Sequence, residues 1–364
     1  MRILIVKLSS IGDVVHALPA AAFLKRAMPE AHISWVVEHK ASAILRECPV
    51  IDQLIVIDKR SLRSHLLDSR TIFEARANPD DPRRSSALKN GDVRVDVAID
   101  LQGLIKSGIV ARVSGAKRRV GFESSDLREK ASRVFLTEQI DTSKLTHVIE
   151  KNLALAHAVA GKMTSAQNSA VGSKGYEFPI TLSPDDELFA ASTVDDANGG
   201  FVILNPGGGW PTKLWPAERF GQLADLLLRE HGLRSIVTFG PGEEQLARRV
   251  EASSQSGAAR PLASTLKQFV ALARRARLFV GGDTGPLHLA AASGTPVVGV
   301  YGPTSAERNG PFDKRDIALG LNLWCRSNCH RRSCWHWECM DIPLGAVAKA
   351  VSVRLGNLER TNAE

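Results

Sequence analysis

Short apolar strands alternate with amphipathic helices through both halves of the chain, and this alternation is the feature that most limits its possible folds. Such a rhythm is typical of parallel sheets that are covered by helices on both faces. We therefore predict an α/β protein with two Rossmann-like, doubly wound parallel sheets facing a central cleft. The expected strands are Ile3–Lys7, Ile33–Val37, Leu54–Ile57, Val95–Asp100, Phe201–Asn205, Ser235–Phe239, Leu278–Gly282 and Pro296–Tyr301. The expected helices are Val14–Ala27, Leu104–Val113, Ala217–Glu230, Glu243–Ala252, Leu266–Ala276 and Pro286–Ser293.

The chain has 364 residues, a length that suggests two domains of similar size. We place an N-terminal domain at residues 1–180, a C-terminal domain at 185–345, and a helical tail at 346–364 that packs back on the N-terminal domain. A polar stretch, Gly161–Gly175, is the expected linker. The arginine-rich and turn-rich region at 61–92 breaks the rhythm and is predicted to be a mobile insertion.

Charge and composition narrow the classes of partner. The net charge is +8 and the isoelectric point is near 9.4, which indicates an anionic partner or simply a solvated basic surface. The N-terminus has no signal-peptide pattern and no apolar run is long enough to span a membrane, so we expect a cytoplasmic protein. Only 5% of the residues are aromatic, which argues against a nucleic-acid binder.

One loop follows the expected strand Leu278–Gly282 and reads DTGPLH. Its glycine and threonine leave backbone N–H groups free at a helix N-terminus, which is a phosphate site, and His288 lies within the first helical turn. Ligands of open α/β sheets bind at this carboxyl edge. The alternative is a tight turn in which Asp283 only caps the helix.

A second loop, NPGGG, follows the first strand of the second half and includes Gly208 and Gly209. Glycine lets the backbone approach a ligand closely, and Lys213 supplies a positive charge for a phosphate. Glu243 and Glu244 lie at the same sheet edge, where they either accept hydrogen bonds from a ribose or only favour a helix N-terminus. Neither a Walker A loop nor a GxGxxG fingerprint occurs here.

Asp13 leaves the first strand of the chain and enters the first helix. A carboxylate at the carboxyl edge of a sheet can take a proton from an attacking hydroxyl, which is the work of a general base. The alternative is an acid that only stabilises the first helical turn.

Four segments together resemble glycosyltransferase family 9, the ADP-heptose:lipopolysaccharide heptosyltransferases. They read KLSSIGDVVHALPA, DLQGLIKS, NPGGGWPTKLWP and GGDTGPLHLAAASGTPVVGVYGPT, and they lie in order along both halves. The likeness is greatest to the heptosyltransferase I branch, through DLQGLIKS, Leu127–Glu129 and His147. The resemblance implies a GT-B fold and an inverting, metal-independent glycosyltransferase.

The resemblance also implies roles for individual residues. Asp13 matches the catalytic base. The positions that match or neighbour the donor pocket are Gly208, Gly209, Lys213, Glu243, Glu244, Asp283, Thr284, Gly285 and His288. The positions assigned to the acceptor side are Lys7, Ser9, Ser10, Arg60, Arg63, Gln102, Lys106 and Arg128. The 61–92 region departs from the family's pattern, and so does the pair Gly208–Gly209, where relatives carry hydroxyl residues.

The implied substrates are ADP-heptose and an acidic acceptor, Kdo-lipid A or a lipopolysaccharide core precursor, used at the anionic inner face of the cytoplasmic membrane. No cofactor is implied, because the ADP-sugar is itself a substrate. Heptosyltransferase II or another family 9 enzyme with a different acceptor or donor is the near alternative. A nucleotide-sugar epimerase of the same fold is a remote one.

Cys325, Cys329, Cys334 and Cys339 form a C-x3-C-x4-C-x4-C segment near the C-terminus. Four thiols at this spacing could hold a structural zinc ion, which prefers sulfur ligands in tetrahedral geometry. The alternatives are reduced cysteines that pack with nearby tryptophans, and a redox linkage. The odd total of five cysteines without an export signal argues against a disulfide scaffold.

Overall fold

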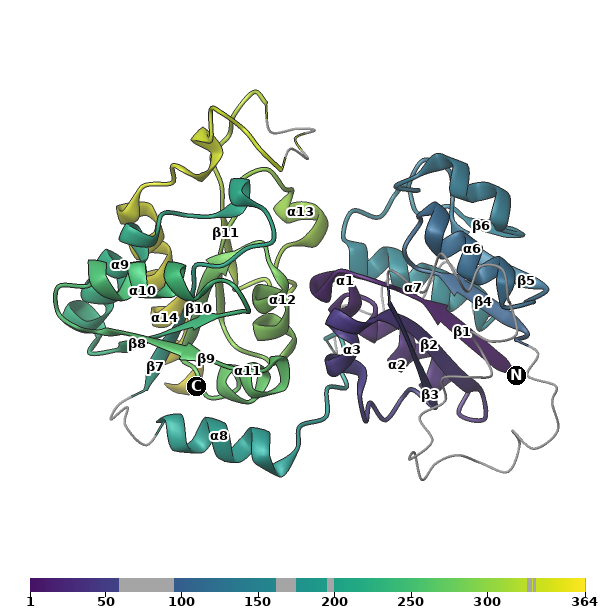
Figure 1. Cartoon of the computed structure of the whole chain (residues 1–364), viewed down its shortest axis with the longest axis horizontal. Coiled ribbons are helices and arrows are strands. Elements are labelled where there is room, and N and C mark those ends of the chain that lie inside the picture. The colour runs from purple at the N-terminus through teal and green to yellow at the C-terminus, as the bar shows by residue number, and fades with distance from the viewer. Residues whose placement is uncertain (59–94, 162–174, 195–199, 326–328, 330–331, 364) are drawn as a thin grey trace. The chain divides into compact units, whose positions relative to one another are not determined.

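A computed structural model describes residues 1–58, 95–161, 175–194, 200–325, 329 and 332–363. The chain divides into two compact units, Met1–Thr181 and Leu182–Glu364, and each is described by itself (Figure 1). The whole of the predicted insertion at 61–92 lies outside the described residues, and so does the predicted linker except for Gly161 and Gly175.

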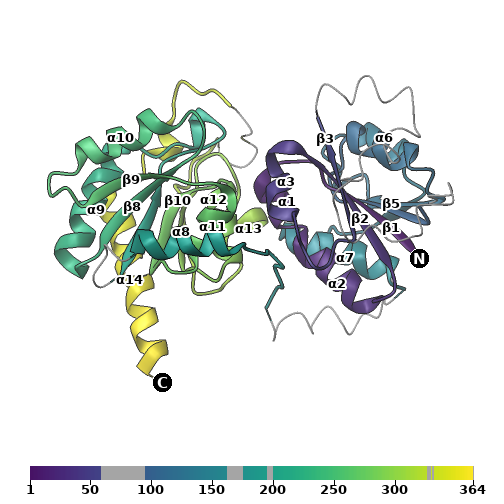
Figure 2. The same cartoon turned by 60° about the horizontal axis from the view of Figure 1, so that its bottom comes forward.

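The first unit is built on a six-stranded parallel sheet in the order β3-β2-β1-β4-β5-β6. In Figure 2 the helix α6 lies on one side of this sheet, and α2 and α7 lie on the other. The strands are β1 (Arg2–Val6), β2 (His32–Glu38), β3 (Gln53–Ile57), β4 (Val97–Asp100), β5 (Arg118–Phe122) and β6 (Glu138–Ile140). The helices are α1 (Ile11–Val15), α2 (Leu18–Ala27), α3 (His39–Leu45), α6 (Ile105–Val113), the 3-10 helix η2 (Lys130–Phe135) and α7 (Val148–Val159).

The second unit repeats this plan with the order β12-β11-β10-β7-β8-β9. Its strands are β7 (Phe201–Asn205), β8 (Arg234–Phe239), β9 (Ala259–Ala263), β10 (Leu278–Gly282), β11 (Val297–Val300) and β12 (Ile317–Leu319). Its helices are α8 (Pro184–Val194), η4 (Pro211–Lys213), α9 (Ala217–His231), α10 (Glu244–Ser253), α11 (Leu266–Ala273), α12 (Gly285–Ala292), α13 (Ala306–Asn309), η6 (Glu338–Met340) and α14 (Leu344–Ala363).

Both sheets are entirely parallel and share one topology, so the α/β prediction with two doubly wound sheets is confirmed. In this strand order the chain reverses direction across the sheet between β1 and β4 in the first unit, and between β7 and β10 in the second. Ligands of such sheets bind outside the carboxyl ends of the strands at these two switch points. The fold therefore points to one binding edge in each unit.

The helix predicted at Val14–Ala27 is in fact two helices, α1 and α2, which are separated at His16 and Ala17. Pro19 explains the break, because proline has no N–H to donate within a helix but is tolerated in the first turn. The chain restarts α2 with Pro19 in that first turn. The shortened α1 begins at Ile11, earlier than expected, so Asp13 stands inside a helix that begins directly after the β1 loop.

The C-terminal helix α14 packs into the second unit. Val347, Val351 and Leu355 lie in the core of that unit, and the predicted contact of the tail with the N-terminal domain stays a prediction. These side chains complete an apolar face beside α9 and β11, and their burial there is favourable. The buried Arg354 adds an ion pair to Asp316, with 2.9 Å between Nε and Oδ1.

None of the helices within the described residues is long and apolar enough to cross a lipid bilayer.

Thr265 forms a capping box with Gln268 at the start of α11, where each side chain accepts a hydrogen bond from the other residue's backbone N–H. Replacing Thr265 with alanine should cost about 1 kcal/mol of unfolding free energy, because one helix N–H loses its partner. Chemical denaturation with urea measures this loss. Ser192, which is exposed on α8 and donates to the Phe189 carbonyl of the same helix, provides the control variant Ser192→Ala, whose stability should change little.

Candidate functional site

The switch point of the first unit collects the residues that follow β1 and β4. Val6 lies opposite Asp100 in the parallel register, so the chain segments that leave these two strands run side by side. Lys7, directly after β1, is buried and donates its ammonium hydrogen to the backbone oxygen of Leu101. Asp100 is also buried and accepts hydrogen bonds from the N–H groups of Gln102 and Gly103. Burial raises the pKa of Asp100, although these hydrogen bonds act to lower it.

Asp13 occupies the centre of this edge. Its Oδ2 accepts hydrogen bonds from the Ser10 backbone N–H at 2.9 Å and from the Ser10 hydroxyl at 3.2 Å. Its Oδ1 accepts from Nη2 of Arg128 at 2.8 Å and lies 3.9 Å from Nζ of Lys7. The carboxylate therefore serves both as a helix cap and as the partner of two cations, so the two sequence interpretations of Asp13 are compatible.

These contacts keep Asp13 ionised. Burial alone would raise the pKa of Asp13, but the charges of Lys7 and Arg128 and the N–H of Ser10 outweigh it and hold the pKa well below its ordinary value of 3.8. The carboxylate is consequently available to accept a proton throughout the neutral range. An acidic ligand that drew Arg128 away would raise the basicity of Asp13.

Other residues assigned to the acceptor side have structural partners here. The Gln102 side-chain oxygen accepts from the N–H of Leu8 at 3.0 Å and from that of Ser9 at 3.4 Å, so it holds the β1 loop in place. Lys106 forms a 2.7 Å ion pair with the buried Glu38, a partner that sequence reasoning missed. Arg60 and Arg63 lie outside the described residues.

Replacing Arg128 with methionine tests the electrostatics of this edge. A folded-state pKa below 3.8 means that ionised Asp13 contributes stability above pH 3.8, and that this contribution is lost as the pH falls through the lowered pKa. Without the guanidinium the pKa of Asp13 should rise, so the acidic limb of the kcat/KM profile should move to higher pH. Arg229→Met, at an exposed arginine of the second unit, is the control. An acidic limb in the same place for both variants would contradict the coupling.

The switch point of the second unit is organised around Asp283, which follows β10 and is only 4% exposed. Lys213 Nζ donates to Asp283 Oδ2 at 2.7 Å and to its backbone oxygen at 3.0 Å. His288 Nε2 lies 3.1 Å from Oδ1. The structure thus brings together three residues that the sequence assigns to the donor pocket, from segments 70 residues apart.

Asn309, at the end of α13, is a residue of this network that sequence reasoning missed. Its Nδ2 donates to Asp283 Oδ1 at 2.7 Å. Its position after β11, at the same carboxyl edge of the sheet, could have indicated Asn309 as a site residue. The SAERNG segment around it, however, carries no recognisable motif.

Asp283 is ionised within this network. Burial alone would raise its pKa, but His288 and Lys213 outweigh burial and hold the pKa of Asp283 well below its ordinary range. The carboxylate therefore fixes Lys213 and His288 in place as a buried anion. The positive charge of Lys213 remains at the sheet edge, with its side chain 15% exposed.

The helix α12 begins at this network with Thr284 as its N-cap residue. The first-turn N–H groups of a helix have no partner inside the helix and attract anions. The Thr284 hydroxyl does not cap the helix, and its buried Oγ1 has no hydrogen-bond partner among the described residues. A buried hydroxyl without a partner beside an anion-binding helix end is what a bound phosphate would satisfy.

The glycine-rich loop after β7 is held by Glu243. Its two carboxylate oxygens accept hydrogen bonds from the N–H groups of Gly208 at 3.0 Å and Gly240 at 2.9 Å. A Cβ at Gly207 would lie 2.3 Å from Glu243 Oε2, so a side chain at this position would displace the Glu243 carboxylate from the loop. Glu244, in contrast, is exposed and pairs with Arg248. The two glutamates therefore differ: Glu243 shapes the loop, and Glu244 faces solvent.

Asn309→Ala tests the contribution of the network. Asp283 would lose one hydrogen bond and would hold Lys213 and His288 less firmly. We therefore expect the KM for the donor substrate to rise by roughly tenfold, which corresponds to the lower end of the free-energy contribution of a hydrogen bond to a charged group. Donor titration in steady-state kinetics measures the effect. The exposed Asn322 gives the control Asn322→Ala, and equal KM values for the two variants would exclude Asn309 from the site.

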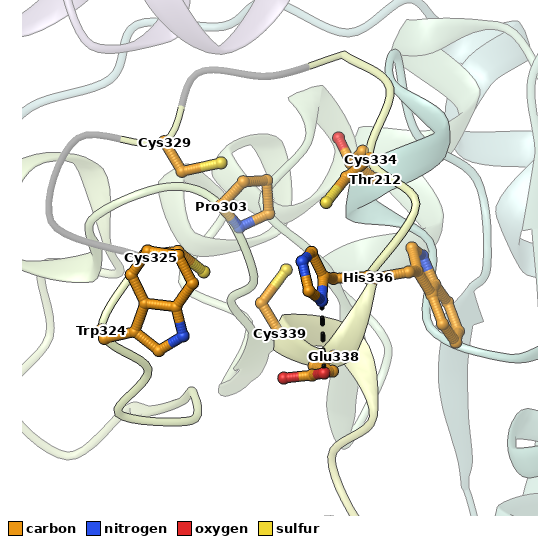
Figure 3. Close-up of a pocket in the computed structure, with 10 residues that line it drawn as sticks. Thr212, Pro303, Trp324, Cys325, Cys329, Cys334, His336, Glu338 and Cys339 are labelled. Carbon is orange, nitrogen blue, oxygen red and sulfur yellow. Dashed lines mark ion pairs between the residues drawn. The ribbon is translucent and has the colours of Figure 1, made fainter.

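The four cysteines of the C-terminal segment lie around one pocket of the second unit, with Thr212, Pro303 and His336 (Figure 3). In this structure none of these four described cysteines forms a disulfide. Within the described part of the chain, no group of three or more His, Cys, Asp or Glu side chains is arranged to hold a metal ion as it stands.

Known proteins resemble the whole chain. A lipopolysaccharide heptosyltransferase 1 of Pseudomonas aeruginosa is 28% identical over 337 residues, which cover 92% of this chain and 87% of that protein. The structure of an E. coli heptosyltransferase with ADP-2-deoxy-2-fluoro heptose superposes with a TM-score of 0.67 at 25% identity, over 88% of this chain and 94% of that one.

A family 9 glycosyltransferase from Veillonella parvula shares the fold, with a TM-score of 0.76 at 22% identity. The matched region covers 98% of this chain and 97% of the Veillonella chain. The predicted GT-B fold class is thereby confirmed. The sequence pattern described as "Glycosyltransferase family 9 (heptosyltransferase)" matches residues 86–336, which is more than half of the chain. The protein therefore belongs to glycosyltransferase family 9.

Proposed function

We propose that this glycosyltransferase moves L-glycero-D-manno-heptose from ADP-heptose to the Kdo region of the lipopolysaccharide inner core, with inversion at the anomeric carbon. The observation that carries the proposal is the pair of switch-point sites: a cation-paired carboxylate in one unit and a lysine–aspartate–histidine network beside a helix N-terminus in the other. Relatives named lipopolysaccharide heptosyltransferase 1 support the choice of donor and of the first heptose.

In this proposal the predicted C-terminal domain, residues 185–345 within the second unit, binds the donor. Lys213 and the N-terminus of α12 meet the diphosphate, and the Thr284 hydroxyl donates to one of its oxygens. Asp283 orients Lys213 through their ion pair, and His288 in turn contacts the Asp283 carboxylate. Because Glu243 occupies the N–H of Gly208, the remaining backbone of the Gly208–Gly209 loop would approach the nucleotide-sugar. The exposed Glu244 is the better placed of the two glutamates to accept hydrogen bonds from a ribose.

The predicted N-terminal domain, residues 1–180 within the first unit, would bind the acceptor. Kdo carries a carboxylate and lipid A carries phosphates, and arginine matches both groups with two parallel hydrogen bonds. Arg128 is half-exposed, whereas Lys7 is buried, so Arg128 can turn toward an anion while Lys7 keeps Asp13 charged. Ser9, Ser10 and Lys106 complete the proposed acceptor side.

The chemical step is a single displacement. The acceptor hydroxyl oxygen attacks the anomeric carbon as the bond from that carbon to the β-phosphate oxygen breaks, and the hydroxyl proton passes to Asp13 and then to solvent. ADP leaves with an additional negative charge, which Lys213 and the α12 N–H groups stabilise. One displacement inverts the configuration, and no covalent enzyme intermediate forms.

An acceptor panel tests the substrates. ADP release from ADP-heptose should depend on Kdo-lipid A and should be slower with core that already carries the first heptose. Faster release with heptosylated core would assign the protein to the heptosyltransferase II step. Consumption of ADP-heptose without any acceptor would instead indicate an epimerase or a hydrolase and would refute the transferase proposal.

We also propose that the protein works at the anionic inner face of the cytoplasmic membrane, where a lipid-linked acceptor is held. The net charge of +8 supports this, because each basic residue near such a surface contributes about 1 kcal/mol of attraction. Cosedimentation with phosphatidylglycerol vesicles should occur and should decrease as salt rises. Equal cosedimentation with neutral phosphatidylcholine vesicles would contradict an electrostatic contact.

A further inference from the structure

The C-terminal segment contains chemistry that the transfer reaction does not use. Cys325, Cys329, Cys334 and Cys339 come from a stretch of fifteen residues and line one pocket of about 20 Å³. Figure 3 shows the four cysteines around this pocket, together with Pro303 and Trp324. A volume of this size accommodates about one water molecule or one ion.

The walls of this pocket are poor in other polar groups. Trp324, Trp337 and Pro303 supply apolar surface, and His336 forms an ion pair with Glu338 at 3.5 Å. Four thiols gathered in apolar surroundings repel one another once ionised, and a soft divalent cation reverses that repulsion.

We propose that Cys325, Cys329, Cys334 and Cys339 bind one thiophilic divalent cation, zinc in the first place, in a closed structural site. Four sulfur ligands and no open position match the structural class of zinc sites. Among the described residues, no three His, Cys, Asp or Glu side chains are close enough to coordinate one ion as they stand. The four sulfur atoms must therefore move closer together when the ion binds. Each ligating thiol releases its proton to solvent, so binding strengthens as pH rises.

The pocket adjoins the loop assigned to the donor. Thr212, which lines the pocket, precedes Lys213 in the 3-10 helix η4. Arg332, from the cysteine-rich segment, lies over the Trp210 ring at 5.5 Å, and Lys213 lies 4.7 Å from the same ring. A cation that fixes the cysteine-rich segment would thereby support η4 and the position of Lys213. This second consequence rests on the proposed function, whereas metal binding itself does not.

Cobalt provides the direct test. The full-length protein, treated with a chelator and a reductant, should take up about one Co²⁺ per chain and develop sulfur-to-cobalt charge-transfer absorption, which zinc then removes by displacement. Cys334→Ser and Cys339→Ser should weaken binding and diminish that absorption. Cys48→Ala is the matched control, because Cys48 is a buried cysteine of the first unit and does not line this pocket. His336→Ala should leave the absorption intact.

Absence of cobalt uptake by folded wild-type protein, or identical absorption in Cys339→Ser and Cys48→Ala, would overturn the metal site. Circular dichroism of each variant checks that loss of binding is not loss of fold. ADP affinity, measured by calorimetry with and without bound zinc, tests the coupling and should fall by about tenfold on zinc removal if the position of Lys213 is lost. Metal uptake without any heptosyl transfer would sink the proposed function and leave the metal site standing.

Discussion

Replacing Asp13 with asparagine should lower turnover by about 10²- to 10⁴-fold, the usual contribution of a general base, while ADP binding stays intact. Asparagine preserves the shape of the side chain but has no charge with which to accept the proton of the acceptor hydroxyl. ADP should bind as before, because its proposed contacts lie in the other unit. Steady-state rates of ADP release and calorimetric ADP titration measure the two quantities.

The structure provides a matched control for Asp13. Asp185 is likewise an acid in a first helical turn, that of α8, but it lies outside both switch points. If Asp13 acted only as a helix cap, Asp13→Asn and Asp185→Asn would both lose some thermal stability and keep their turnover. Turnover near the wild-type value in Asp13→Asn would remove the residue from catalysis.

Replacing Lys213 with methionine should lower kcat/KM by roughly 10²- to 10³-fold, the effect of losing one donor that stabilises developing negative charge. Methionine keeps most of the length of the lysine side chain but removes the charge that meets the departing diphosphate. The substitution also leaves Asp283 with fewer cationic partners, so the pKa of Asp283 should rise. ADP affinity should fall with kcat/KM, unlike in Asp13→Asn.

Lys349→Met, at an exposed lysine of α14 in the same unit, is the control for general loss of positive charge. It should bind ADP as wild type does. An ADP dissociation constant that is the same for Lys213→Met and Lys349→Met would refute the assignment of Lys213 to the diphosphate.

The sequence was informative wherever a strand is buried on both faces. β7 and β10 were predicted with correct bounds, because a fully buried parallel strand is a continuous apolar run that glycine or polar residues end abruptly. The strands β5, β6, β9 and β12 were missed. Sequences such as RRVGF and ARPLA belong to strands that are partly exposed, so they lack a continuous apolar run.

For the sites, the sequence alone identified the loops at the carboxyl ends of β1, β7 and β10, because strand ends, glycines and charged residues are local features. Only the tertiary structure decided which side chains meet. It joined Lys213 to Asp283, added Asn309, and turned Glu243 toward the glycine loop. These contacts link residues 26 to 70 positions apart, and they depend on strand order and register. The composition of a single segment does not encode strand order or register, because these result from the packing of all strands and helices within each sheet's own unit.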